Sequence, residues 1–265
     1  MTTNEKIKVV TDTMIWYNFA MGSIKIEDAF KCELIVPITV LFEASTNPAL
    51  WEDELKFKEC QKVAKLLILK KQEVTFIKKD PLGYLSAKIS SGSQDVEFER
   101  YFDNLEFIAN HNFNEMLEIP QHELRNIPQS TTNYFNSQSK FYQHAIKRNI
   151  SKNVFNKTST LSMTLKLTNA IVNKYASERG IQIERKLEED DAKLFINVFD
   201  YYLKEFSRSH MKMINNDWVD LLNLTYVHCD MKYWTKETKW QKFISEYDQN
   251  YLYELNNSII KYNHE

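Results

Sequence analysis

The amino-acid sequence predicts an α/β protein with a parallel sheet flanked by helices, and three observations support this class. Short runs of apolar and β-branched residues alternate with stretches of helical spacing, which is typical of parallel strands joined by crossover helices. Glycine and proline are scarce, at 4 and 5 of 265 residues, which disfavours a sandwich of many short strands. Hydrophobic residues are 43% of the chain and aromatic residues 13%, so the chain can fill a sizeable core.

Three strands are expected in the first 80 residues. Residues 9–11 are Val, Val and Thr, whose β-branched side chains favour a strand that ends at Asp12. A second strand at 34–38 runs directly into a helix that we expect Thr39 to cap. The remaining elements expected in this block are helices at 15–31 and 52–71 and a strand at 73–77.

The alternation stops after residue 80. From about 84 to 210 the sequence predicts helices and irregular segments, including one helix from Leu161 to Gly180 and another from Glu188 to His210. Toward the C-terminus we expect a helix at 218–228, a strand at 231–235, a helix at 236–245 and an edge strand at 251–253. The prediction is therefore one α/β domain in two sequence blocks, 1–80 and 211–265, with a helical insertion at 81–210.

The insertion contains two segments of opposite charge. Residues 95–123 hold eight acidic side chains and one basic, a net charge of −7, whereas residues 138–186 hold ten basic and two acidic, a net charge of +8. The basic segment interleaves aromatic residues with its cations, a composition typical of surfaces that bind phosphates and stack bases. A basic helix pair that docks on the acidic segment is the structural alternative. The residues that we single out for RNA contact are Lys140, Lys147, Arg148, Lys152 and Lys157.

Composition also bears on location. The formal net charge is −2, so binding to a polyanion has to come from local asymmetry of charge. There is no run of 18 apolar residues, and the N-terminus lacks the apolar region of a signal peptide. The cysteines, Cys32, Cys60 and Cys229, have neither a disulfide pattern nor zinc-ligand spacing. We therefore expect a cytoplasmic protein without a membrane span.

Four acidic residues occupy equivalent places relative to the expected strands. Asp12 follows the first strand, and Glu43 lies on the helix after the second. Asp220 lies on a C-terminal helix, and Glu237 follows the last full strand. Parallel strands bring their carboxyl ends to one edge of a sheet, so these carboxylates can meet there. Such a group raises the pKa of each member, and a hard cation such as Mg²⁺ or Mn²⁺ would neutralise it.

Structural roles remain open for several of these residues. Asp12 could cap the helix that follows it, and Asp217 after Asn216 could cap a later helix. Glu237 could be a solvated surface residue between Lys236 and Lys239. The metal-site prediction therefore depends on all of the acids together and not on any one of them.

At these positions the sequence resembles the PIN-domain nucleases. The matching stretches are Val9 to Thr13, Ile35 to Glu43, and Asn216 to Glu237, which lie in the two outer blocks. In that family an Asp follows the first strand and a Glu lies on the helix after the second. One or two Asp begin a later helix, which leads to a strand, a Thr and a final acid. The resemblance implies a PIN-like fold for the two outer blocks, and the large helical insertion between them lies outside it.

The resemblance also implies roles for individual residues. Asp12, Glu43, Asp220 and Glu237 would hold one or two Mg²⁺ or Mn²⁺ ions, with Asp217 as a further or alternative ligand. Thr235 would place its hydroxyl beside the site. The ions would lower the pKa of a bound water and stabilise charge on the scissile phosphate. We therefore predict a divalent-metal-dependent endoribonuclease, whose products would carry a 5′-phosphate and a 3′-hydroxyl.

The chain departs from the family pattern in two ways. The final acid is usually Asp but here is Glu237, one methylene longer, and the insertion is longer than compact toxin members of the family carry. Two alternatives stay open: a PIN-like binding or scaffold protein that has lost catalysis, and a structure-specific DNA nuclease. A toxin with an antitoxin partner, an antiviral defence nuclease with a partner protein and an RNA-processing enzyme all fit, as does a homo-oligomer.

Overall fold

Four parallel strands form the centre of the protein, which is described by a computed structural model over residues 6–91, 98–119, 160–208 and 215–255. The strands are β1 (Lys8–Thr11), β2 (Glu33–Pro37), β3 (Thr75–Ile77) and β4 (Met231–Trp234). Their order across the sheet is β3-β2-β1-β4, and every neighbouring pair is parallel. The predicted α/β class, with a parallel sheet flanked by helices, is confirmed.

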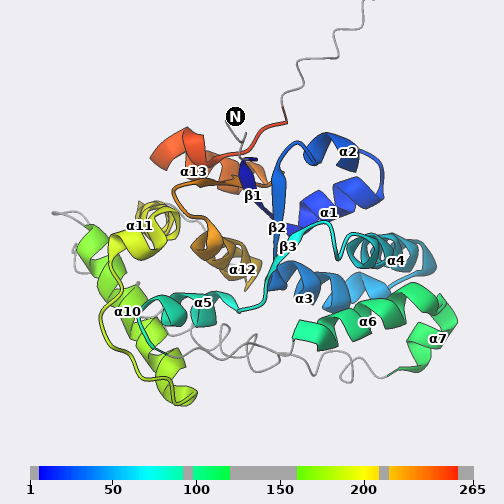
Figure 1. Ribbon diagram of the computed structural model, residues 1–265, viewed down its shortest axis with the longest axis horizontal. Coiled ribbons are helices and arrows are strands. Elements are labelled where there is room, and N and C mark those ends of the chain that lie inside the picture. The colour runs from blue at the N-terminus through cyan, green and yellow to red at the C-terminus, as the bar shows by residue number, and fades with distance from the viewer. Residues whose placement is uncertain (1–5, 92–97, 120–159, 209–214, 256–265) are drawn as a thin grey trace, which may run out of the picture.

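Helices connect the strands and cover both faces of the sheet (Figure 1). The described α-helices are α1 (Thr13–Ala20), α2 (Ile26–Ala29), α3 (Ile38–Thr46), α4 (Glu54–Leu69), α5 (Pro81–Lys88), α6 (Phe98–Asn110), α7 (Phe113–Glu118), α10 (Thr160–Glu178), α11 (Lys193–Arg208), α12 (Asn215–Asn223) and α13 (Thr238–Asp248). Short 3₁₀ turns lie at Pro48–Trp51, Glu189–Ala192, Leu224–Tyr226 and Gln249–Tyr251. No helix in these described ranges is long and apolar enough to cross a membrane.

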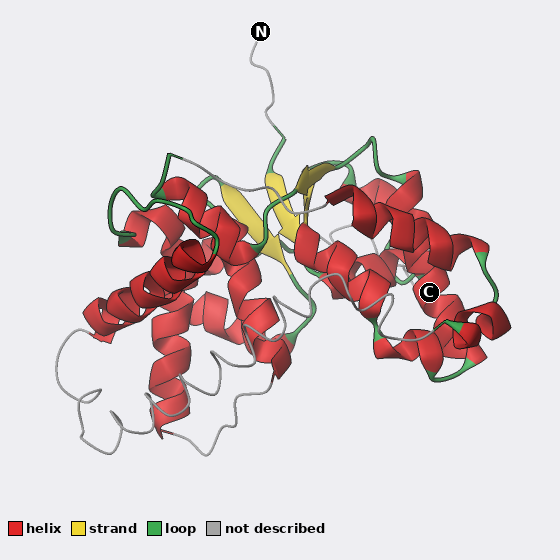
Figure 2. Ribbon diagram, turned by 90° about the horizontal axis from the view of Figure 1, so that it is seen from below, coloured by secondary structure: helices red, strands yellow, loops and turns green. Residues whose placement is uncertain are grey.

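The two faces of the sheet follow directly from the two-residue period of its strands. Val9 and Val10 are both fully buried, but they belong to different hydrophobic clusters. In β4, Tyr233 shares the cluster of Val10, and Trp234 shares that of Val9. Successive side chains of a strand point to opposite faces, so each strand contributes to both cores. Figure 2 shows the sheet between the two groups of helices.

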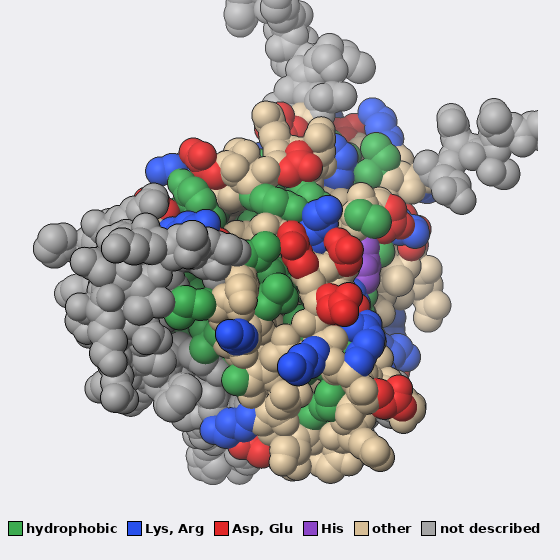
Figure 3. All heavy atoms as spheres, turned by 90° about the vertical axis from the view of Figure 1, so that its left-hand side faces the viewer, with side chains coloured by type: hydrophobic (Ala, Val, Ile, Leu, Met, Phe, Trp, Pro, Cys, Tyr) green, Lys and Arg blue, Asp and Glu red, His purple; other side chains and the backbone are tan. Residues whose placement is uncertain are grey.

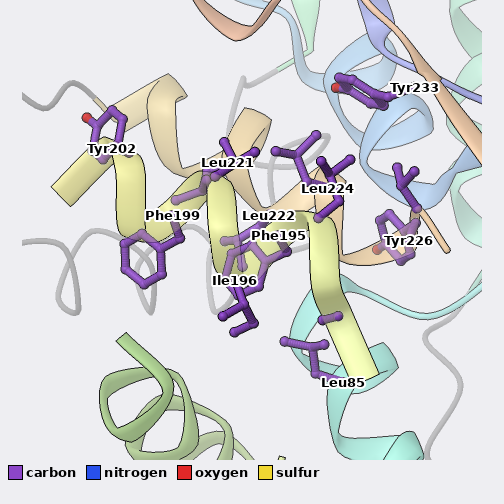
Figure 4. Close-up of a cluster of buried hydrophobic side chains, with 14 of the residues drawn as sticks. Leu85, Phe195, Ile196, Phe199, Tyr202, Leu221, Leu222, Leu224, Tyr226 and Tyr233 are labelled. Carbon is purple, nitrogen blue, oxygen red and sulfur yellow. The ribbon is translucent and has the colours of Figure 1, made fainter. Parts of the chain in front are cut away.

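One core is built largely from helices of the predicted insertion. Phe195 and Phe199 of α11 pack with Leu85 of α5 and with Leu221 and Leu222 of α12 (Figure 4). Ile171, Val172 and Tyr175 of α10 join the same cluster, together with Val10 and Ile35 of the sheet. The helices α5, α10 and α11 therefore share a hydrophobic core with the sheet of the outer blocks.

The other core contains α1, α3, α4 and α6. Phe102 of α6 packs edge-on against Phe76 of β3, at a centroid distance of 5.3 Å. Trp16 of α1 donates from its ring nitrogen to the Thr11 hydroxyl at 3.0 Å, which satisfies a buried polar atom at the end of β1. Residues on both sides of the predicted boundary at residue 80 thus cover this face as well.

Local signals account for several helix boundaries. Asp53 caps α4 by accepting from the backbone N–H of Lys56 at 2.8 Å. Asp80 caps α5, and Pro81 occupies its first turn, where a missing N–H costs no hydrogen bond. Gly180, with φ of +66°, follows the end of α10, as predicted from the glycine in the sequence.

Three local predictions are wrong. Residues 15–31 form two helices, α1 and α2, because Gly22 with φ of +75° turns the chain between them. The helix α3 starts at Ile38 directly after Pro37, so Thr39 lies inside the helix and does not cap it. Residues 251–253 form no strand: the pairing with the sheet is one isolated bridge, between Tyr233 and Leu252.

Replacing Leu34 in β2 tests the packing of the sheet. Leu34 is 2% exposed, so Leu34→Ala leaves a cavity and should lower the free energy of unfolding by about 2–5 kcal/mol. Leu55→Ala, at a residue that is 71% exposed on α4, is the control and should change it by less than about 0.5 kcal/mol. Urea unfolding followed by circular dichroism measures both, and equal losses in the two variants would contradict this packing.

Candidate carboxylate site

Asp12 lies at the carboxyl end of the central strand β1. Its backbone N–H donates to the carbonyl of Trp234 at 3.1 Å, so the pairing of β1 with β4 continues to this residue. In the sheet, β1 lies between β2, the next strand in the sequence, and β4, the last described strand. The strand order therefore reverses direction at β1, which makes its carboxyl end a topological switch point. Ligands of open α/β sheets bind outside the carboxyl ends of strands at such points.

Asp12 also caps α1, as the structural alternative anticipated. Its Oδ1 accepts from the backbone N–H of Ile15 at 3.0 Å. The residue is 6% exposed, and loss of hydration raises the pKa of Asp12 to about 6 despite favourable interactions with Thr235 and the backbone. One carboxyl oxygen therefore serves the helix, while the carboxylate as a whole stands in an environment that disfavours its charge.

Thr235 and Glu237 lie at the end of β4, beside Asp12. The Thr235 hydroxyl accepts from the backbone N–H of Glu237 at 3.0 Å and interacts with the Asp12 carboxylate. Glu237 occupies the N-cap position of α13, but its side chain makes no capping hydrogen bond. That side chain is therefore left to interact with its neighbours, and burial raises its pKa.

Glu43 reaches the same region from α3, the helix that follows β2. The Thr13 hydroxyl, next to Asp12, donates to Oε2 of Glu43. Burial, followed by the charges of Asp12 and Glu237, raises the pKa of Glu43 to about 7, although the Thr13 hydrogen bond opposes this rise. Thr13 thus joins the first strand–helix unit to the second.

Asp220 approaches from α12, on the other face of the sheet. The Thr39 hydroxyl of α3 donates to the Asn223 side chain of α12 at 2.5 Å. Glu43 is four residues after Thr39, and Asp220 is three residues before Asn223, so both acids lie on the helix faces that meet. Burial and then the charges of Glu237, Glu43 and Asp12 raise the pKa of Asp220 to about 8.

The four carboxylates act on one another electrostatically in every pairwise combination. Tyr233, fully buried in β4, has its pKa raised first by burial and then by the charges of all four acids. Asp12, Glu43, Asp220 and Glu237, which we call the carboxylate cluster, therefore share one electrostatic environment although they come from distant parts of the sequence. Mutual repulsion of this kind stabilises protonated forms unless a cation is bound.

The donor set suits a hard cation, since it consists of carboxylate oxygens with a neighbouring hydroxyl. In the described residues no three Asp, Glu, His or Cys side chains converge closely enough to hold a metal ion as they stand. The raised pKa values of Glu43 and Asp220 support a cation site. A bound cation would remove the repulsion between carboxylates that causes part of each rise.

Asp217 has other partners. It is 4% exposed, its Oδ1 accepts from the Lys239 ammonium group, and its Oδ2 accepts from the Tyr202 hydroxyl at 2.8 Å. Both carboxylate oxygens therefore already have hydrogen-bond partners, which makes Asp217 less suited to coordinate a metal ion. The structure places Asp217 next to the carboxylate cluster, through its charge on Glu237, and pairs it with a lysine.

Two residues near the cluster were not anticipated from the sequence. The ring nitrogen of Trp240 is buried without a hydrogen bond of ordinary geometry, yet it lies near enough to Asp220 and Glu237 to lower the pKa of both. The sequence does contain a signal for Trp240, because residues three apart on a helix lie on one face and Trp240 is three residues after Glu237. Tyr202 comes from α11 in the predicted insertion, and nothing in its local sequence connects it with Asp217.

The RNA-contact residues predicted in the basic segment, Lys140, Lys147, Arg148, Lys152 and Lys157, lie outside the described residues. Figure 3 shows one face of the molecule, where acidic and basic side chains lie side by side over the described part. That part of the face is mixed in charge and is not a basic surface of the kind expected for RNA. The prediction for the basic segment stays a prediction.

The fold and site define the chain as a three-layer α/β protein with a carboxylate cluster at the switch point of its sheet. Comparisons with protein-family models, with curated proteins and with solved structures gave no match to this chain.

The raised pKa values predict how stability depends on pH without divalent metal. In the unfolded chain Asp12, Glu43 and Asp220 would lose their protons near 3.8–4.5, whereas in the folded protein they keep them to about 6, 7 and 8. The folded state therefore holds more protons in this window, so the contribution of these three groups to stability is fully present below about pH 4 and is lost as pH rises to 8.

Urea midpoints measured in EDTA from pH 5 to 8 test this expectation. Asp220→Asn removes one of the titrating groups and should give a flatter decline than the wild type. Asp230→Asn is the control, because the pKa of Asp230 is lowered by Lys8 and lies below the window. Stability that rises with pH across this range in the wild type would contradict the electrostatic description of the cluster.

Proposed function

We propose that the protein is a divalent-metal-dependent endonuclease that hydrolyses phosphodiester bonds of RNA, on a PIN-like fold with a large helical insertion. One observation supports this most strongly: four carboxylates from four different elements influence one another at the switch point of a parallel sheet. Such a group by itself lowers the stability of the folded chain, because its members repel one another. A bound hard cation would neutralise that repulsion and could also take part in catalysis.

The chain's own residues would divide the work. Asp12, Glu43, Asp220 and Glu237 would hold one or two Mg²⁺ or Mn²⁺ ions. When bound, the metal supplies a water of lowered pKa and stabilises charge on the scissile phosphate. Thr235 orients Asp12 through its hydroxyl, and Thr13 orients Glu43 through its own. Asp217 is the less suited ligand, because both of its oxygens already have partners.

Burial of the site supports this division of roles. Asp12 and Thr235 are 6% and 3% exposed, so water is largely excluded from this part of the cluster. Charges interact more strongly where the local dielectric is low, which favours both metal binding and charge stabilisation in the reaction. Hydrolysis by a metal-bound water needs no side-chain nucleophile, and none is assigned.

The partners and location follow as further parts of the proposal. RNA is the proposed substrate, with DNA as the alternative, and the proposed macromolecular partners are an antitoxin or defence protein, or a second copy of the chain. Cys32, Cys60 and Cys229 are all free thiols, which supports a reducing cytoplasm as the location.

Metal binding should stabilise the protein most at a pH at which the carboxylates are ionised and repel one another. At pH 8, Mn²⁺ at ~100 times its Kd should raise the Tm by roughly 5–10 °C, because it binds only the folded state. Asp12→Asn and Asp220→Asn should each reduce this rise, whereas Asp230→Asn at the amino end of β4 should retain it. Thermal unfolding in EDTA and in Mn²⁺ gives these values, and equal rises in all four proteins would place the metal elsewhere.

Cleavage should require Asp12. We expect wild type to cleave single-stranded RNA in Mn²⁺, and Asp12→Asn to lower the rate by about 100-fold or more, as for loss of one preorganised electrostatic group. The asparagine can still accept from Ile15, so the cap of α1 is retained while the negative charge is lost. Asp230→Asn serves as the control with the same chemical change.

Denaturing gel electrophoresis of labelled RNA and DNA oligonucleotides separates the remaining functions. Cleavage of DNA in preference to RNA would replace the proposed substrate. Cleavage of neither, with intact folding and metal binding, would favour a binding or scaffold protein. A rate unchanged in Asp12→Asn would remove the carboxylate cluster from the reaction.

A further inference from the structure

A buried ion pair stands beside the carboxylate cluster. The ammonium group of Lys239 on α13 donates to Asp217 on α12, whose other oxygen accepts from Tyr202 of α11. The Asp217 side chain is 6% exposed, whereas that of Lys239 is 32% exposed. The pair therefore has a buried acidic end, fixed by two helices, and a basic end that reaches solvent.

Aromatic rings hold Lys239 in place at this position. Its Nζ lies 5.1 Å from the ring centroid of Tyr202 and 5.1 Å from that of Trp240. Cation–π attraction at such distances favours an ammonium group over a neutral side chain. Trp240 also borders Asp220 and Glu237, so the lysine and the cluster share a neighbour.

Lys239 lies in the first turn of α13, two residues after Glu237 at the N-cap, so its ammonium group stands at the border of the cluster. The ammonium group has three N–H donors, one of which is used by Asp217. A phosphodiester that approaches four carboxylates is repelled by them, and a fixed cation at the border of the cluster would offset this repulsion.

We propose that Lys239 binds a non-bridging phosphate oxygen of the nucleic-acid substrate beside the carboxylate cluster, and that Asp217 and Tyr202 are positioning residues that hold its ammonium group there. This inference rests on the proposed nuclease function. It gives Asp217, which the sequence suggested as a metal ligand, a different role at the same site. The substrate class is a phosphodiester chain, bound as a point charge without base recognition.

The test compares Lys239→Met with Lys236→Met, which removes the same charge from an exposed residue three positions away. Binding of a fluorescent single-stranded RNA is measured by anisotropy in Ca²⁺ at several salt concentrations, and cleavage is measured in Mn²⁺. Lys239→Met should raise the Kd and KM by about tenfold and reduce the slope of log K against log salt by about 0.7. Lys236→Met should resemble wild type in both, and Lys239→Arg should restore most of the binding.

Asp217→Asn, alone and combined with Lys239→Met, tests the positioning role. If Asp217 acts through Lys239, the double variant should bind RNA no more weakly than Lys239→Met alone. Thermal unfolding identifies a variant that fails to fold, and in that case Tyr202→Phe, which removes only the hydroxyl on Asp217, replaces it. A purely structural ion pair would lower the Tm and leave Kd, KM and the salt slope unchanged.

The outcomes separate this inference from the proposed function. If wild type cleaves RNA and Lys239→Met has the same KM and salt slope, the lysine role is wrong while the nuclease stands. If wild type binds RNA without cleavage and Lys239→Met loses binding, the lysine role stands and the nuclease fails. If wild type binds neither RNA nor DNA, Lys239 has no phosphate to bind and the inference is overturned.

Discussion

Parallel pairing of β1 with both of its neighbours is the constraint on which the rest of this structure depends. Val10 pairs with Ile35 on one side and with Tyr233 on the other, so segments more than 190 residues apart end at the same edge of the sheet. That register places Asp12 beside Thr235 and sets the start of α3 on the same side. This pairing brings the ends of β1 and β4, and with them Asp12 and the segment that holds Glu237, to one edge of the sheet.

The same register creates an electrostatic problem at that edge. Four carboxylates interact in surroundings that are partly or fully buried, and the pKa values of all four are raised as a result. Hydroxyl groups of Thr13 and Thr235 stabilise the charged forms locally, but burial remains the larger effect on Glu43 and Asp12. An arrangement that folding alone would disfavour is what one expects at a site that acts on a ligand.

The fifth acid, Asp217, is treated differently by the fold. Its charge contributes to the raised pKa of Glu237, but a lysine and a tyrosine hydroxyl are its direct partners. The tyrosine comes from α11, within the long segment between the outer blocks, and the same segment covers both faces of the sheet. That segment therefore contributes both to the surroundings of the site and to the hydrophobic core of the protein.

The sequence by itself determined the elements and the identity of the acids. β-branched runs and helical spacing are local properties, so the four strands, the long helices and the glycine after α10 were predictable. The four acids of the cluster were also predicted as a group from their places in the sequence: Asp12 and Glu237 each follow a strand, Glu43 lies on the helix after β2, and Asp220 lies on the helix before β4. Only the tertiary structure decided that Asp217 pairs with Lys239, that Trp240 borders two of the acids, and that Tyr202 supplies a hydroxyl from a distant helix. These contacts join residues on different helices, and a side chain's partner across such a gap is set by packing, which no local pattern records.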